Sequence, residues 1–193
     1  VTFSAVDPVV NGVASGVERI EVSLNGGAFA AYTAALTFAE GRHTVRFRAT
    51  DNVGSVSAAQ TLELRCDATP PITALAAGGA YFITTDALGE RRYAPPSFSY
   101  TLPATDPVAS DVASGLASTR YRTGQVLAGQ FVPAPLLPYL GAFTLAEGIR
   151  RVEFESTDNV GNAEALKSET VSIDASAPVT SLSVGEPQYD PGA

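Results

Sequence analysis

Residue types that carry catalytic or metal chemistry are scarce in this sequence of 193 residues. It contains no Met, no Trp, one Cys and one His. A single Cys excludes an internal disulfide framework, so the stability has to come from packing. One His and one Cys are too few for a zinc cluster, and no glycine-rich phosphate loop lies between a strand and a helix. We therefore expect no catalytic residues and no enzyme activity.

Basic charge and long apolar runs are also scarce. Lys and Arg number 12 against 20 Asp and Glu, which gives a net charge of -8. An acidic chain is repelled by phosphate backbones, and no window combines clustered Lys and Arg with aromatics, so nucleic acid is excluded as a partner. No apolar run approaches the length of a membrane-spanning helix. A primary translation product begins with Met, so we expect a processed chain or a window on a longer protein.

Apolar and turn-forming residues are plentiful. Hydrophobic residues make up 45% of the chain, and Gly and Pro occupy 17 and 13 positions. Val45, Phe47 and Ala49 alternate with polar neighbours, a period of two that predicts a strand with one buried face. Asn25-Gly26-Gly27 supplies residues that tolerate the positive φ of a tight hairpin. The sequence therefore predicts short antiparallel strands.

Two sets of motifs occur twice. Asp7–Gly16 recurs as Asp106–Gly115, 99 residues later, and Thr50–Gly54 recurs as Thr157–Gly161, 107 residues later. Self-similarity at a fixed spacing is the signature of repeat architectures. The eight-residue difference between the two offsets predicts an insertion in the second copy, which we place as an elaborated loop at the Pro-rich stretch Val132–Pro138.

A Pro-containing segment predicts the boundaries of the repeats. Asp67–Thr73 matches Asp174–Thr180, and Pro in such a segment gives a short, stiff joint. We therefore divide the chain into residues 1–67, a first repeat without the leader Pro71–Pro96, and residues 68–175, a second repeat with the insertion. Residues 176–193 are expected to form a joint and the first strand of a third repeat, or a strand exchanged with another molecule.

Motifs of the first copy resemble the bacterial immunoglobulin-like repeats of large secreted and cell-surface proteins. The residues that carry this resemblance are Ser15-Gly16-Val17, Ser23–Gly27, Glu40–Val45 and Ala49–Gly54. The second copy departs at Tyr121–Gln125, where the hairpin motif is replaced. The resemblance implies tandem immunoglobulin-like antiparallel β-sandwiches, an all-β fold located outside the cell or on its surface.

Two functions remain open on these grounds. The first is a structural or adhesive repeat segment of an extracellular bacterial surface protein or fibre. Its partners would be neighbouring repeats or identical subunits head to tail, and a surface glycan or a protein receptor. The second is an accessory binding or spacer module of a secreted polysaccharide-active enzyme. Tyr81, Tyr93, Tyr121 and Tyr139 would then supply the aromatic surface for sugar.

Acidic residues recur in the turns and suggest a cation site. In an immunoglobulin topology the joint residue Asp67 faces Asp106, Asp111 and Asp158 of the next unit. Oxygen ligands from both sides of a joint are what Ca²⁺ prefers, and its binding would stiffen the joint. The alternative is that these residues only form Asx turns. His43 is expected on the solvent face of its strand, and Cys66 in the core.

Overall fold

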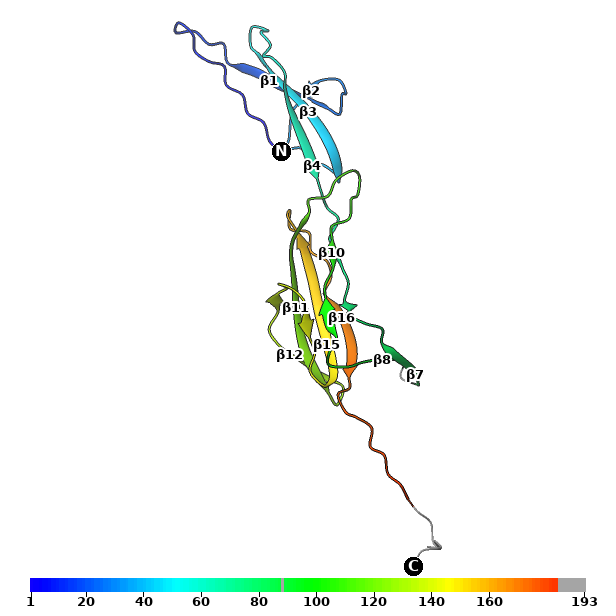
Figure 1. Cartoon of the computed structure of the whole chain (residues 1–193). Helices are drawn as coiled ribbons and strands as arrows, with labels where there is room; N and C mark the ends of the chain where they lie inside the picture. Colours follow the sequence, from blue (N-terminus) through cyan, green and yellow to red (C-terminus); the bar gives the residue numbers. More distant parts are fainter. Residues whose placement is uncertain (88, 184–193) are drawn as a thin grey trace, which may run out of the picture.

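The computed structural model describes residues 1–87 and 89–183, and their regular structure is made of strands (Figure 1). No helix among these residues is long and apolar enough to cross a membrane. The strands are β1 (Val17–Leu24), β2 (Ala30–Ala31), β3 (Gly41–Asp51), β4 (Gln60–Cys66), β5 (Ile72–Thr73), β6 (Ala76–Ala77), β7 (Phe82–Asp86), β8 (Gly89–Ala94), β9 (Ser99–Thr101), β10 (Ala104–Thr105), β11 (Leu116–Leu127), β12 (Gln130–Pro133), β13 (Leu137–Pro138), β14 (Phe143–Thr144), β15 (Gly148–Asp158) and β16 (Lys167–Ile173).

The first 67 residues, called here the first copy, form one antiparallel sheet in the order β2-β1-β3-β4. Asn25 and Gly26 have φ of 47° and 79°, and the N–H of Gly27 donates to the carbonyl of Leu24 at 2.9 Å. This is the tight turn that the sequence predicts between β1 and the next segment. The sheet lies at one end of an elongated molecule (Figure 1).

Residues 68–175, called here the second copy, form a larger assembly of sheets. A seven-stranded sheet runs β12-β11-β15-β16-β8-β7, with β13 also paired to β11. A three-stranded sheet, β14-β9-β6, and the pair β10-β5 accompany it. Tyr100 of β9 and Phe154 of β15 belong to one buried apolar cluster, so the two larger sheets share a core. The chain is thus all-β with several sheets, consistent with the β-sandwich class.

The two copies pair their long strands in the same way. Val17 of β1 faces Asp51 of β3, and Leu116 of β11 faces Asp158 of β15. Each pairing has a register shift directly after this first pair. Since Leu116 and Asp158 are the counterparts of Val17 and Asp51 by the sequence offsets, the repeated motifs adopt equivalent strand pairing.

The insertion is not the loop that we predicted. Strand β11 continues four residues beyond the position equivalent to the end of β1, and β12 adds four paired residues on the other side of the turn. The N–H of Ala134 donates to the carbonyl of Thr123 as Gly27 does to Leu24. The eight extra residues therefore lengthen a hairpin in register. Gly124 begins this extension, and a Cβ there would collide with the carbonyl oxygen of Val132.

The prediction that His43 lies on the solvent face of its strand is wrong. It lies two residues from Val45, which is fully buried, and side chains two apart on a strand point to the same side. Its ring is half-buried, packs 5.0 Å from the ring of Phe38 and bonds through Nε2 to the carbonyl of Ala39 at 2.9 Å. The interpretation as a structural strand residue still fits these contacts, whereas the expected exposure does not.

The end of the chain is described only in part. The segment of residues 176–183 contains no strand, and residues 184–193 of the predicted third unit lie outside the described residues.

Cys66 is a free thiol and only half-buried, while its counterpart Ile173 is buried in the core. The first copy thus covers the end of its sheet less completely than the second copy does.

Burial of the central aromatic residue differs between the copies, and this yields a prediction. Phe154 is 2% exposed inside the core, whereas its counterpart Phe47 is half-buried against Phe3, 4.7 Å away. We expect Phe154→Ala to lower the free energy of unfolding by about 3–5 kcal/mol, because it removes a fully packed ring. Phe47→Ala should cost clearly less. Urea denaturation of both variants measures this, and equal losses would contradict it.

Candidate functional site

Hydrogen bonds connect the two copies at the joint, Asp67–Thr73. The carboxylate oxygen Oδ2 of Asp67 accepts from the N–H of Ser114 at 2.6 Å, and its carbonyl oxygen accepts from Asn162 Nδ2 at 3.1 Å. Arg42 Nε of the first copy donates to the carbonyl oxygen of Asp111 at 3.2 Å. These three bonds join Asp67, which follows β4, and Arg42, at the start of β3, to two loops of the second copy.

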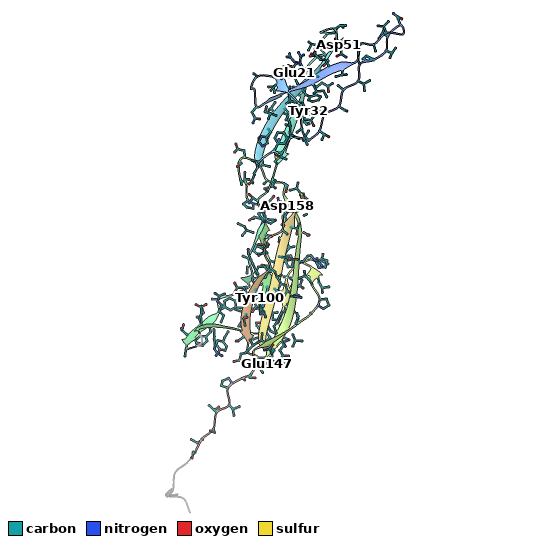
Figure 2. The ribbon with its side chains drawn as sticks, turned by 180° about the vertical axis from the view of Figure 1, so that it is seen from behind. Glu21, Tyr32, Asp51, Tyr100, Glu147 and Asp158 are labelled. Carbon is teal, nitrogen blue, oxygen red and sulfur yellow. The ribbon has the colours of Figure 1, made fainter. Side chains whose placement is uncertain are left out.

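Three carboxylates converge at this joint. Each of Asp67, Asp106 and Asp158 offers an oxygen atom, and these oxygens lie within 4.8 Å of one another. Asp158 marks the position in Figure 2, at the end of the second copy that faces the first. Asp111, the fourth residue named from the sequence, does not belong to this group; it contacts the first copy through its backbone.

Asp158 is fixed by the turn that follows β15. Its Oδ1 accepts from the N–H groups of Val160 and Asn162 at 3.0 and 2.8 Å, and its Oδ2 accepts from Asn162 Nδ2 at 2.7 Å. Asp51 makes the equivalent turn after β3 with Val53 and Ser55. The predicted Asx-turn role is therefore present in both copies, and it accounts for the recurrence of these residues.

Asp106 is less completely satisfied. Its Oδ2 accepts from the N–H of Gly115 at 2.6 Å, as Asp7 accepts from Gly16 in the first copy. Its Oδ1 is buried and has no hydrogen-bond partner. A buried carboxylate oxygen without a donor costs free energy, which a cation at this position would offset.

Local hydrogen bonds favour the ionised forms of Asp67 and Asp158. Hydrogen bonding from Ser114 lowers the pKa of Asp67, against desolvation and the nearby charge of Asp158. For Asp158, desolvation is the largest single effect and raises the pKa. The hydrogen bonds from Asn162, Val160 and Gly161 together outweigh it, so the pKa lies below its usual value. Both groups are therefore carboxylates at neutral pH, the form that binds a hard cation.

Two contributors to the joint were missed from the sequence. Asn162 donates to both Asp67 and Asp158, and Arg42 reaches the loop at Asp111. A comparison of the copies could have indicated Asn162, because its counterpart is Ser55, whose shorter side chain carries no amide. No pattern in the sequence identifies Arg42, because the contact depends on how the two copies meet.

The four tyrosines considered for sugar binding are all half-buried. Tyr81, Tyr121 and Tyr139 pack against the core of the second copy, and Tyr121 lies 6.0 Å from Tyr139 and 4.5 Å from Phe143, ring to ring. Tyr93 lies 6.2 Å from the ring of Phe82. A flat, exposed aromatic surface is not formed by these four residues.

Comparison with known proteins adds no assignment. The sequence matches no protein-family model, and no curated protein is significantly similar to it. The functional argument therefore depends on the geometry of the joint and on the internal repeat.

The carboxylate group yields a test with Ca²⁺. If the site has the affinity of extracellular calcium modules, 10 mM Ca²⁺ should raise the melting temperature by about 3–6 °C. Asp67→Asn should abolish the increase, because it removes a ligand. Asp174→Asn is the matched control: Asp174 accepts from Ser176 N–H in the same motif, but it belongs to no carboxylate group among the described residues. Calorimetry at low protein concentration measures the shift, and an equal response of the two variants would contradict a site at the joint.

Proposed function

We propose that this chain is a non-catalytic structural segment of an extracellular surface protein or fibre, built from tandem immunoglobulin-like β-sandwich repeats. The observation that carries the proposal is the hydrogen-bonded joint. Asp67 and Arg42 link two copies of one motif set end to end, which is the arrangement that a spacer or stalk requires.

The equivalent strand pairing supports the repeat interpretation. β1 and β3 in the first copy, and β11 and β15 in the second, share register and register shift. The amino-terminal sheet and the sheets of the second copy lie along one axis (Figure 1). An array of such units becomes longer with each added repeat, and its exposed surface makes any adhesive contacts.

The internal packing of the tyrosines favours this function over a sugar-binding accessory module. Sugar platforms use exposed aromatic faces, and the rings of Tyr81, Tyr121 and Tyr139 pack against the core. The extended hairpin β11-β12 and the hairpin β7-β8 are present only in the second copy. In this proposal they are the surfaces that give specificity for a glycan or a protein receptor.

Stiffness of the joint is the property to measure. Spin labels at the exposed positions Val53 and Leu140, in a Cys66→Ser background, report the separation of the two copies. We expect a narrow distance distribution that broadens when Asp67→Ala and Arg42→Ala are combined, because both remove bonds across the joint. Asp174→Ala with Arg46→Ala is the control and should leave it narrow. A broad distance distribution in the spin-labelled protein without substitutions at the joint would contradict a stiff spacer.

The location outside the cell has its own test. Antibodies raised against this segment should bind intact cells of the organism that produces it, and protease treatment of intact cells should remove the signal. Binding that requires permeabilised cells would contradict the proposal. An antibody against a cytosolic protein provides the control for cell integrity.

A further inference from the structure

Strand β5 lies where the chain enters the second copy from the joint, and side chains of the second copy hold it there. The N–H of Thr73 donates to Glu164 Oε2 at 3.1 Å, and the Thr73 carbonyl oxygen accepts from Lys167 Nζ at 2.8 Å. The hydroxyl of Thr73 shares a hydrogen bond with that of Ser156, which shares another with the hydroxyl of Thr119 at 2.8 Å. Both polar backbone groups of Thr73 are thus bound by charged side chains.

Glu164 and Lys167 also form an ion pair with each other. Glu164 Oε2 and Lys167 Nζ lie 2.7 Å apart, and the side chain of Glu164 is 5% exposed. Thr73 is buried between them. Hydrogen bonds to charged groups are stronger than those between neutral groups. These three residues, Thr73, Glu164 and Lys167, are called the clamp below.

Thermodynamic stability does not account for the charges in the clamp. The desolvation of a buried ion pair can exceed its Coulomb attraction, and well-packed apolar replacements are often as stable. Glu164 Oε1 is also buried without a hydrogen-bond partner, which costs free energy. The first copy has Ser57 and Gln60 at the positions of Glu164 and Lys167. The charged pair is therefore a feature of the second copy and not a requirement of the repeated motifs.

Backbone pairing connects β5 to a short strand only. Ile72 and Thr73 pair with Thr105 and Ala104 of β10, and these two strands make a sheet of their own. Among the described strands, β5 pairs with none of the seven-stranded sheet. The clamp and the hydroxyl of Ser156 therefore join β5 directly to that sheet through side chains.

The clamp holds β5 at the start of the strand by which the chain leaves the second copy. Lys167 is the first residue of β16, and β16 runs away from the joint because it is antiparallel to β15, which ends at Asp158. After Ile173 the chain leaves at the opposite end of the second copy (Figure 1). There the N–H of Asp174 donates to the carbonyl oxygen of Ala94 at 3.1 Å.

We propose that Glu164 and Lys167 are load-bearing residues, which pass tension along the array from β5 directly into β16. The 94 positions that separate Thr73 from Lys167 in the sequence then carry no load while the clamp is closed. The two bonds to the backbone of Thr73 are loaded together, because they bind the N–H and the carbonyl of one residue. This inference rests on the proposed structural function and adds the route that force takes.

Force spectroscopy on the full chain tests this route. Handles are attached through cysteines added before Val1 and after Ala193 in a Cys66→Ser background, and the second copy is recognised by the longer stretch of chain that it releases. The test variant combines Glu164→Gln with Lys167→Met. We expect its second copy to unfold at least tenfold faster at constant force, because forced unfolding is governed by the unfolding rate, which the clamp slows.

A second ion pair provides the matched control. Arg122 and Glu153 join β11 to β15, with Nη2 and Oε2 2.6 Å apart and the Glu153 side chain 7% exposed. This pair is buried like the clamp pair but lies off the proposed route. Arg122→Met with Glu153→Gln should therefore raise the unfolding rate less than threefold at the same force. Urea denaturation of both double variants gives their losses of equilibrium stability for comparison.

The direction of pulling separates load bearing from general stabilisation. Leu140 and Val160 are exposed positions of the second copy. With handles at Leu140→Cys and Val160→Cys, the force enters and leaves without passing through Thr73. The substitutions at Glu164 and Lys167 should then change the unfolding rate less than threefold.

Contrary results would overturn the load route in distinct ways. Equal acceleration in both pulling directions, or by both double variants, would mean that the clamp only stabilises the fold. An unchanged unfolding rate in the clamp variant would mean that the clamp carries no load. The proposed structural function would stand in either case if the spin-label distances across the joint are narrow. It fails independently of the clamp if those distances are broad or if antibodies bind only permeabilised cells.

Discussion

The need to cover one apolar face of each long hairpin underlies the whole architecture. Val45 of β3 and Val152 of β15 are both fully enclosed. In the second copy, β8, β9 and their neighbours complete the cover, and a core of eight buried residues results. In the first copy, the segment around Phe3 covers part of the same face. The half-burial of Phe47 and Cys66 follows from that difference.

Local chemistry made much of this fold predictable. The alternation around Val45 and Phe47, the positive-φ turn at Asn25-Gly26 and the repeated Asp turns depend on residues close together in sequence. Such features follow from periodicity and spacing, which a single sequence contains. The meeting of Asp67 with Asp106 and Asp158 was instead predicted from the immunoglobulin topology and the head-to-tail order of the copies.

Other features depended on information that spacing does not contain. The extended hairpin β11-β12 was mistaken for a loop because Pro residues mark both loops and edge strands, and here Pro133 ends a paired strand. Asp111 was included because it shares a loop with Asp106, yet its backbone alone reaches the first copy. The face of His43 could have been obtained from counting alone, since it is in phase with Val45.

The hairpin extension shows how the second copy accepts added sequence without losing its core. Four residues were added on each side of the turn, so every pair below it, from Thr123 and Val152 downward, keeps its partner and its face. An odd number of added residues would leave one residue unpaired and require a bulge. Growth in steps of two residues therefore allows this hairpin to change length during evolution while the sheet beneath it stays the same.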